Sequence, residues 1–281
     1  MGAVEGTTRV VGIFGDPVHH SLSPRMHNAA FVALGLDYVY VPLRPTARTI
    51  GEAVGAIRAL GLVGVNVTVP FKQEVIEHLD SLSDEARAVG AVNTIVAGEG
   101  GCLAGANTDV EGFAGALRAR GVRLRGKRAL LIGAGGAARA VVQSLVAGGA
   151  ADVVIANRTL ARARSLAADF DAGTLRARGL DALEDADLLA DRNVVINSTS
   201  VGLKGAALPG YSIEATAMDC VHFDLAYGEK PTAFVAAAER AGRPAIDGRY
   251  MLLYQGIAAF KLFTGRKAPA DVMARAIGIV G

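Results

Sequence analysis

The segment Gly133-Ala134-Gly135-Gly136-Ala137-Ala138 decides the expected fold, because a buried-strand pattern, Arg128–Ile132, runs directly into it. The residues that follow, Ala137–Val146, have the apolar spacing of a helix packed on a sheet. Glycines between a strand and a helix allow a sharp turn and a close approach of the backbone to a pyrophosphate, whose charge the helix N-terminus stabilises. The segment therefore predicts a dinucleotide-binding domain of the Rossmann type.

The end of the next strand indicates which dinucleotide binds. This strand, Asp152–Ala156, ends in Asn157-Arg158-Thr159, about twenty residues after the glycine turn. NAD-binding domains usually place an acidic residue here, which binds the ribose 2′-hydroxyl. An arginine fits a 2′-phosphate instead, although a surface arginine is often only a solvated charge. The sequence therefore predicts NADP (NADPH/NADP⁺) as the cofactor.

Length, charge and cysteine content restrict the class of protein. A chain of 281 residues accommodates two domains, and 29 Lys and Arg against 27 Asp and Glu give a net charge of only +2, which does not predict binding to nucleic acid or membranes. The N-terminus has no signal-like pattern and no apolar run is long enough to span a membrane, so we expect a cytoplasmic protein. Cys102 and Cys220 have no metal-binding spacing, so two buried free thiols and no metal site are expected.

The chain from Arg9 to about Asn107 alternates short apolar runs with helical patterns, which predicts a first α/β domain. The expected strands are Val10–Phe14, Tyr38–Val41, Val65–Val69 and Val92–Val96. The expected helices are Pro24–Leu34, Thr49–Leu60, Phe71–Leu79 and Ser83–Val89.

A helix over Val110–Arg120, preceded by Thr108 and Asp109, is expected to connect the two domains. The long apolar helix Arg249–Thr264 is expected to return to the first domain. The sequence thus predicts an α/β fold of two domains with a cleft between them. Residues 1–108 and 248–281 would bind the substrate, and residues 109–247 would bind NADP. Later elements of the second domain are expected at Leu160–Ala168, Val194–Asn197 and Val221–Leu225.

Polar side chains within an apolar strand need partners, since an unsatisfied buried polar group costs about 1–3 kcal/mol. Asn66 and Thr68 would point to one face of their strand and the intervening valines to the other. Pro70 ends the strand and Lys72 lies just beyond it. Open α/β sheets bind ligands at such strand ends. Together with the serines of Ser21-Leu22-Ser23-Pro24, these groups suit a small polyhydroxylated acid.

Seven segments occur in the order and at the spacing of the shikimate dehydrogenase family, which the chain resembles over nearly its whole length. They are Ser21–Pro24, Asn66–Lys72, Gly90–Thr94, Asn107–Asp109, Gly133–Ala137, Asn157–Thr159, and Asp247-Gly248 to Gln255-Gly256. The resemblance implies the reversible, NADPH-dependent reduction of 3-dehydroshikimate to shikimate on the route to aromatic amino acids.

The resemblance also implies roles for individual residues. Lys72 and Asp109 match the family's catalytic pair. A neutral amine accepts a proton, whereas a nearby carboxylate favours the charged ammonium, so which of the two moves the proton stays open. The implied substrate contacts are Ser21, Ser23, Thr68, Lys72, Asn93, Asp109, Tyr227 and Gln255. The implied cofactor contacts are Asp84, Gly133, Ala134, Gly135, Gly136, Ala137, Asn157, Arg158, Thr159, Arg162, Leu225 and Gly248.

Several of these residues have simpler explanations when taken singly. Ser23 and Thr108 suit helix caps, Asn93 suits a turn, and Asp84 suits a helix start at Ser83. His27 matches no catalytic position and is assigned a structural role. Thr232 is followed by Ala233 where relatives commonly have proline, so the loop after Tyr227 is expected to differ in shape.

Three alternatives remain at the level of sequence: a quinate/shikimate dehydrogenase, an aminoshikimate dehydrogenase, and a non-catalytic NADP-binding regulator. Arg158 argues against plain NAD. A regulator would be expected to lack Lys72 or Asp109, and both are present. Monomer and homodimer are both compatible with the sequence.

Overall fold

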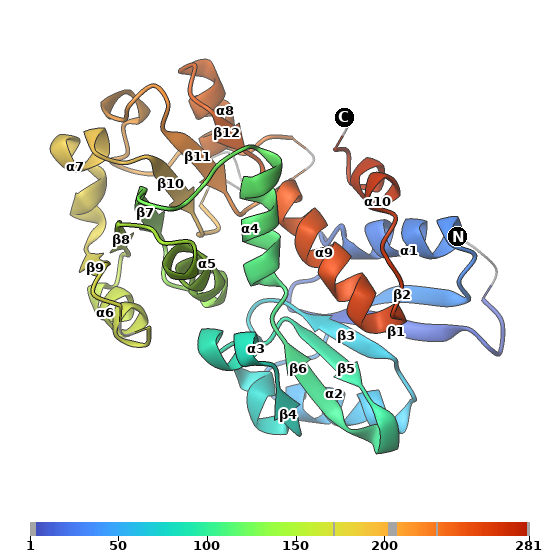
Figure 1. Cartoon of the computed structure of the whole chain (residues 1–281). Coiled ribbons are helices and arrows are strands. Elements are labelled where there is room, and N and C mark those ends of the chain that lie inside the picture. The colour runs from blue at the N-terminus through green and yellow to red at the C-terminus, as the bar shows by residue number, and fades with distance from the viewer. Residues whose placement is uncertain (1–3, 171, 202–206, 229, 280–281) are drawn as a thin grey trace. The chain divides into compact units, whose positions relative to one another are not determined.

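Two six-stranded sheets organise the chain, one in each of two units (Figure 1). The computed structural model describes residues 4–170, 172–201, 207–228 and 230–279. Unit 1 consists of Met1–Gly112 and Leu252–Gly281, and unit 2 of Phe113–Met251. The chain passes from unit 1 to unit 2 after Gly112 and returns to unit 1 at Leu252.

The sheet of unit 1 has the strand order β2-β1-β3-β5-β6-β4 and mixed strand directions. Strand β1 pairs in parallel with β2 and β3, whereas β5 is antiparallel to both β3 and β6. The link between β5 and β6 is a short turn in which Gly100 and Gly101 have φ values of 66° and 78°, and a link this short requires antiparallel neighbours. The bounds are β1 (Arg9–Phe14), β2 (Tyr38–Leu43), β3 (Gly64–Val67), β4 (Ser81–Leu82), β5 (Thr94–Ala97) and β6 (Leu103–Ala106).

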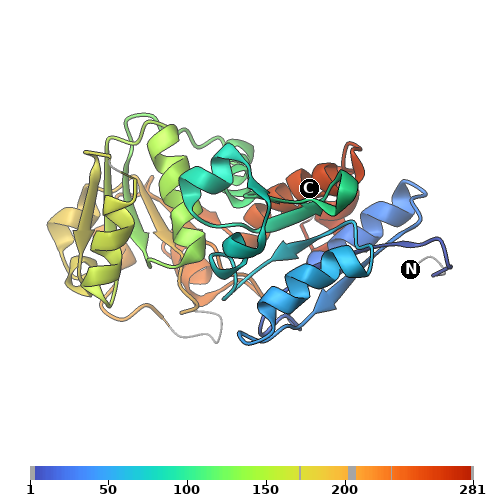
Figure 2. The same ribbon diagram turned by 90° about the horizontal axis from the view of Figure 1, so that it is seen from below.

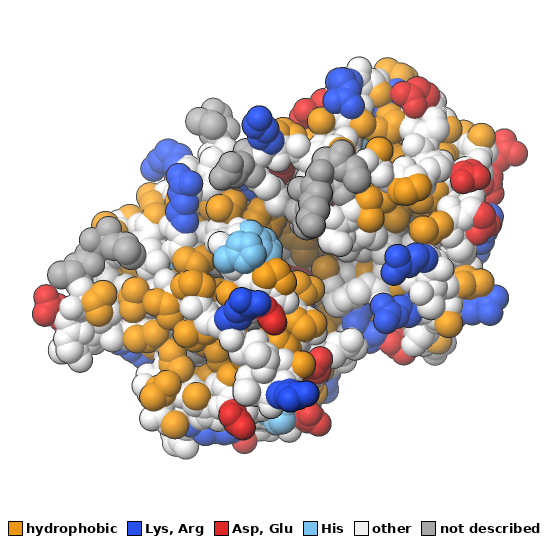
Figure 3. Space-filling view, turned by 180° about the vertical axis from the view of Figure 1, so that it is seen from behind, with side chains coloured by type: hydrophobic (Ala, Val, Ile, Leu, Met, Phe, Trp, Pro, Cys, Tyr) orange, Lys and Arg blue, Asp and Glu red, His pale blue; other side chains and the backbone are white. Residues whose placement is uncertain are grey.

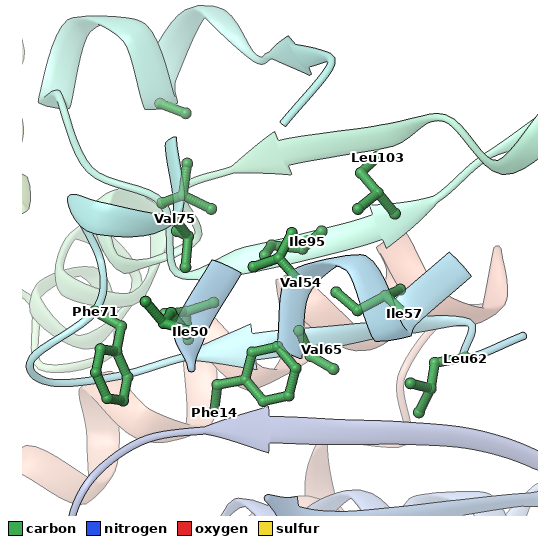
Figure 4. Close-up of a cluster of buried hydrophobic side chains, with 13 residues drawn as sticks. Phe14, Ile50, Val54, Ile57, Leu62, Val65, Phe71, Val75, Ile95 and Leu103 are labelled. Atoms are coloured by element: carbon green, nitrogen blue, oxygen red, sulfur yellow. The ribbon is translucent and has the colours of Figure 1, made fainter. Parts of the chain in front are cut away.

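Helices cover both faces of this sheet. On one face, Val54 and Ile57 of α2 pack with Phe14, Val65 and other strand residues in a closed apolar cluster (Figure 4). On the other face, the aromatic rings of α1 and α9 meet, and the Phe31 and Phe260 centroids lie 5.4 Å apart. The helices of unit 1 are α1 (Ser23–Ala33), α2 (Ile50–Ala59), η1 (Glu74–His78), α3 (Asp84–Val89), η2 (Glu99–Gly101), α9 (Gly248–Thr264) and α10 (Ala270–Ala276).

Helix α9 enters unit 1 at Leu252, so the prediction that it returns to the first domain is confirmed. Its packing depends on Gly256, because a Cβ atom there would lie 2.1 Å from Met26 Cε of α1. The glycine therefore allows the two helices to approach closely.

The expected helix over Phe71–Leu79 is wrong. Only a 3₁₀ helix, η1, forms there. The Lys72 carbonyl accepts a hydrogen bond from Val92 N (2.7 Å), so Ile76 N instead donates to the Gln73 carbonyl (3.2 Å). The same bond to Val92 precedes β5, which begins at Thr94 rather than at Val92.

The sheet of unit 2 is parallel in all its pairings and has the order β12-β11-β10-β7-β8-β9. Numbered from its first strand, this is the doubly wound order of dinucleotide-binding domains, whose ligand site lies where the strand order reverses, between β7 and β10. The predicted Rossmann-type domain is confirmed. The bounds are β7 (Arg128–Ile132), α5 (Gly136–Ala147), β8 (Asp152–Ala156), α6 (Leu160–Ala168), β9 (Leu175–Arg178), η3 (Leu180–Leu183), α7 (Ala186–Ala190), β10 (Val194–Asn197), η4 (Ile213–Ala215), β11 (Val221–Asp224), α8 (Ala233–Arg240) and β12 (Ala245–Ile246).

Both faces of this sheet are covered, which explains why its strands are continuously apolar. Leu130 and Val195 share one buried cluster with Leu189 of α7 and Phe234 of α8. The opposite face holds Phe223, whose ring stacks on Phe113 of α4 (Asp109–Ala119) at 5.1 Å. Figures 1 and 2 show α5 on the face opposite α7.

Charges of both signs are distributed over the surface, as the face in Figure 3 illustrates. None of the helices in the described ranges combines the length and apolar character needed to span a bilayer. Cys220 is buried, but Cys102 is exposed because it follows the glycine turn between β5 and β6, so the expectation of two buried thiols is wrong for Cys102.

Candidate functional site

Lys72 and Asp109 form a largely buried ion pair in unit 1. Lys72 Nζ lies 2.5 Å from Asp109 Oδ2, and the two side chains are 12% and 7% exposed. Lys72 lies in the segment between β3 and η1, whereas Asp109 begins α4. Such a pair is stable away from water only when its remaining hydrogen-bonding positions are filled.

Asn93 supplies the second partner of the carboxylate. Its amide Nδ2 donates to Asp109 Oδ1 and to Thr108 Oγ1, both at 2.9 Å. Its Oδ1 accepts from Thr108 N at 2.7 Å, and Asp109 N donates to Asn107 Oδ1 at 3.0 Å. Both amide hydrogens of Asn93 are thus used within the protein, which orients the Asp109 carboxylate toward Lys72.

A second layer of polar residues supports Asn93. Asn66 Nδ2 donates to the Asn93 carbonyl (3.1 Å) and to Thr94 Oγ1 (2.9 Å), and Asn66 Oδ1 accepts from the Tyr40 hydroxyl (2.7 Å). Sequence reasoning identified Asn66 and Thr94 as polar residues on or beside strands but gave no role to Tyr40. The two apolar flanks of Asn66, Val65 and Val67, point into the opposite core, as the alternation predicts.

The other expected substrate contacts of unit 1 come from three places. Ser21 Oγ accepts from Ser23 N (3.3 Å) at the start of α1, where Leu22 rather than Ser23 is the N-cap. Thr68 directly follows β3, and a Cβ atom at Gly15 would lie 2.4 Å from its Cγ2. Gln255 is buried in α9 and donates to the Leu252 carbonyl (2.8 Å).

Asp84 belongs to unit 1 and has a structural explanation. Ser83 Oγ accepts from Ala86 N (3.1 Å), which makes Ser83 the N-cap of α3, and the Asp84 side chain is fully exposed in the first turn. An acidic residue in a first turn stabilises a helix through its dipole. Contact between Asp84 and a cofactor stays a prediction.

The glycine turn of unit 2 is built for close approach. Gly133 has a φ of 108°, and a Cβ atom there would lie 2.5 Å from Ser198 Oγ, so no other residue fits without displacement. Among the residues that the structure describes, no side chain caps the N-terminus of α5 and none lies within 4 Å of a Cβ atom built on Gly135. Ala134, Gly136 and Ala137 complete the turn and are partly exposed. This arrangement leaves backbone N–H groups available to an anion.

Sequence reasoning missed Ser198, which closes this turn from the neighbouring strand. Its hydroxyl donates to the Ile132 carbonyl at 2.8 Å. Asn197, at the end of β10, donates to Asp224 Oδ1 at 3.1 Å. The polar run Asn197-Ser198-Thr199, which directly follows an apolar strand, was the sequence feature that could have identified Ser198.

Two arginines follow the end of β8. Arg158 and Arg162 are exposed, and neither has an ion pair within the described parts of the chain, whereas nearby Arg139 pairs with Asp169. The first turn of α6 contains no acidic residue. Asn157 Nδ2 donates to the Thr159 carbonyl (2.9 Å), which shapes the turn between them. Positive charge that is not neutralised at a helix N-terminus favours a phosphate ligand.

A buried carboxylate, Asp224, precedes the segment with Leu225 and Tyr227. Burial, with a smaller contribution from the charge of Asp247, raises the pKa of Asp224 to about 6, although three hydrogen bonds to the carboxylate act in the opposite direction. Gly248, at the start of α9, lies against this segment, since a Cβ atom there would be 2.5 Å from the Leu225 carbonyl oxygen. The structure thus brings Leu225 and Gly248 together, as the expected roles require.

His27 has a structural position. Both ring nitrogens are buried and have no hydrogen-bond partner among the described residues, and the ring stacks on Tyr40 at 4.6 Å near Phe31 and Phe260. Burial lowers the pKa of His27 to about 3.

Proteins of known activity resemble the chain over nearly its full length. A curated shikimate dehydrogenase (NADP(+)) of Carboxydothermus hydrogenoformans is 39% identical over 98% of this chain and 99% of the relative. The solved shikimate 5-dehydrogenase of Thermus thermophilus, in complex with NADP(H) and shikimate, is 36% identical with a TM-score of 0.85 and coverages of 96% and 98%. Quinate dehydrogenase of Corynebacterium glutamicum, in complex with NAD, is 28% identical with a TM-score of 0.88 and coverages of 96% and 98%.

A doubly wound unit with a glycine turn and a second α/β unit with a buried Lys–Asp pair define a two-domain, nicotinamide-dependent dehydrogenase. Family models match residues 13–95 (shikimate dehydrogenase substrate binding domain), 116–219 (shikimate/quinate 5-dehydrogenase) and 248–277 (shikimate 5′-dehydrogenase C-terminal domain). The chain belongs to the shikimate dehydrogenase family.

We predict that in His27→Leu the free energy of unfolding depends less on pH between pH 7 and pH 4 than in the wild type. Below pH 6.5 the unfolded chain protonates His27 while the folded protein does not until about pH 3, so this residue lowers stability as pH falls through that range. The free energy of unfolding of His27→Leu should therefore fall less steeply from pH 7 to pH 4, by up to about 1.4 kcal/mol per pH unit. Urea titrations at several pH values measure this slope. The exposed His19→Gln is the control, and equal slopes for wild type and His27→Leu would contradict the prediction.

Proposed function

We propose that this chain catalyses the reversible reduction of 3-dehydroshikimate to shikimate with NADPH, a step toward the aromatic amino acids. The observation that carries the proposal is the Lys72–Asp109 pair, held by Asn93 in a chain that is 39% identical to a curated shikimate dehydrogenase (NADP(+)). Unit 1 is the substrate domain and unit 2 the NADP domain. The cleft between them, a cytoplasmic location and the choice between monomer and homodimer stay predictions.

The cofactor would be held by unit 2. Bound NADP⁺ would accept the hydride that leaves the alcohol carbon of shikimate. The close approach at Gly133 fits its pyrophosphate, and the charges of Arg158 and Arg162, which have no ion pair within the described parts of the chain, fit its 2′-phosphate. The full set of cofactor contacts is Asp84, Gly133, Ala134, Gly135, Gly136, Ala137, Asn157, Arg158, Thr159, Arg162, Leu225 and Gly248.

Lys72 exchanges a proton, through its Nζ atom, with the hydroxyl group of the substrate. Both Asp109 oxygens accept hydrogen bonds, one from Asn93 and one from Lys72, so this carboxylate acts as an oriented acceptor. An ammonium group has three N–H donors, and the bond to Asp109 uses only one of them. Lys72 can therefore stabilise the charge that develops on the reacting oxygen while Asp109 keeps it in place.

The remaining polar groups bind the hydroxyls and the carboxylate of the substrate. They are Ser21, Ser23, Thr68, Asn93, Tyr227 and Gln255. Hydroxyl and amide groups both donate and accept, which suits a ligand that carries several hydroxyls. Because Asn93 already uses both amide hydrogens within the protein, its main contribution is to orient Asp109.

The alternative with a specific observation in its favour is quinate dehydrogenase, since a solved quinate dehydrogenase shares this fold at 28% identity. That relative binds NAD, whereas Arg158 here favours a 2′-phosphate. The test is absorbance of reduced nicotinamide with the purified chain, with shikimate and quinate each combined with NADP⁺ and NAD⁺. Rapid reduction only with shikimate and NADP⁺ supports the proposal. Preference for quinate or NAD⁺ would favour the alternative, and inactivity in all four mixtures with NADP bound would favour a regulator.

Loss of either member of the ion pair should remove turnover but not cofactor binding. We expect Lys72→Met and Asp109→Asn to lower kcat by at least about a hundredfold, the usual contribution of a positioned proton-transfer group. The Kd for NADPH, measured by fluorescence titration, should stay within about twofold of wild type. Neither side chain is among the proposed cofactor contacts, so their loss affects the chemical step and not cofactor binding. Lys267→Met, an exposed lysine of the same unit, is the matched control. Turnover near wild type in either variant would remove that residue from the mechanism.

Replacement of Arg158 should separate the two cofactors. We expect Arg158→Asp to raise the Kd for NADP⁺ at least about tenfold, since a charge-assisted bond to phosphate is lost and repulsion is added. The Kd for NAD⁺ should change far less. Arg164→Asp, at an exposed position of α6, the helix that follows Arg158, controls for the change in net charge. Equal losses for both cofactors would show that Arg158 does not contact the 2′-phosphate.

A further inference from the structure

Asp224 is a fully buried carboxylate that the catalytic mechanism does not use. It has no exposed surface and ends β11, directly before Leu225. Within the described residues it forms no ion pair with a lysine or arginine, and the carboxylate of Asp247 disfavours its charged form. Burial of a charge without a counter-ion is costly. Stability alone is therefore a poor explanation for a carboxylate at this position.

The contacts of Asp224 reach both ends of the segment that follows it. Oδ1 accepts from Ala226 N (3.0 Å) and from Asn197 Nδ2 (3.1 Å), and Oδ2 accepts from Thr232 Oγ1 (2.6 Å). Thr232 is also the N-cap of α8, where its Oγ1 accepts from Val235 N (3.3 Å). One side chain thus ties the beginning of the segment to the start of the next helix and to the end of β10.

The backbone of the segment is also confined from the opposite direction. Leu225 N donates to the Asn197 carbonyl at 2.9 Å. A Cβ atom at Gly248 would lie 2.5 Å from the Leu225 carbonyl oxygen and 2.6 Å from that of Ala226. The peptide groups from Leu225 to Ala226 therefore lie between the Asp224 carboxylate and the first turn of α9, with little freedom to move.

We propose that Asp224 and its donor Thr232 are positioning residues that set the backbone course from Leu225 to Tyr227. The inference rests on the proposed contacts of Leu225 with the nicotinamide and of Tyr227 with the substrate. Loss of the Thr232 hydroxyl releases one end of the segment and displaces Tyr227, whereas the sites for the pyrophosphate and the 2′-phosphate keep their contacts. The consequence is a higher KM for shikimate and a lower kcat/KM, while the adenosine end of the cofactor binds as in the wild type.

The experiment compares three threonine variants of the full chain. Thr232→Val removes the hydroxyl, whereas Thr232→Ser keeps it. Thr216→Val removes another buried threonine hydroxyl of unit 2, which donates to the Ile213 carbonyl (2.7 Å). We measure the KM for shikimate, kcat, the Kd for NADP⁺ and the Tm of each. Thr232→Val should raise the KM for shikimate and lower kcat/KM by about ten- to a hundredfold, as expected for a displaced substrate-binding group. Thr232→Ser and Thr216→Val should keep the wild-type KM, and the Kd for NADP⁺ should stay within about twofold in all three.

If Thr232→Val does not fold, Asp224→Asn, which keeps the shape of the side chain, is expected to have the same effect. A wild-type KM in a folded Thr232→Val or Asp224→Asn variant overturns the positioning role alone, and so does an equal rise in KM in Thr216→Val. A wild-type chain that binds NADP⁺ but does not oxidise shikimate overturns the proposed function and the positioning role with it.

Discussion

The ion pair between Lys72 and Asp109 dictates how polar groups are arranged in unit 1. Two charges withdrawn from water remain stable only if their other hydrogen-bonding positions are filled, and Asn93 fills the free oxygen of Asp109. Asn66 then orients Asn93, and Tyr40 orients Asn66. The ends of β3, β5 and β6 have to meet near the start of α4 for these bonds to form. The mixed sheet of unit 1 provides that meeting point.

Unit 2 satisfies a different requirement, which is to keep positive charge and backbone donors available for an anion. Arg158 and Arg162 have no carboxylate partner among the described residues, although Arg139 and Arg176 in the same unit are paired. Glycine at position 133 lets the turn pass against Ser198 without obstruction. A ligand rather than the protein is the natural partner of such groups. The two units therefore use polar residues in opposite ways, one closed around a charged pair and the other open to a charged ligand.

Local pattern was sufficient for most of the secondary structure. The strand over Arg128–Ile132 and the helix from Leu160 to Ala168 have the bounds that the sequence pattern indicates, because the strand is apolar along its buried length and the helix buries one regular face. The α-helix predicted for Phe71–Leu79 was wrong. Val92 N, which is distant in the sequence, donates a hydrogen bond to the Lys72 carbonyl, so this carbonyl does not accept the bond of an α-helix. The strands β4, β6, β9 and β12 were missed because each has only two to four residues, which is too short to show a period.

The sequence by itself determined the two-domain α/β class, the glycine turn and the charge at the end of β8, since each depends on neighbouring residues and their periodicity. Motif resemblance named Lys72, Asn93 and Asp109, but only the tertiary structure decided that Asn93 holds the carboxylate and that Tyr40 and Asn66 support it. Only the structure, too, showed that Asp224 joins Asn197, Ala226 and Thr232. Hydrogen bonds between distant segments leave no periodic trace in the chain, because they depend on side-chain positions that exist only after the strands have paired.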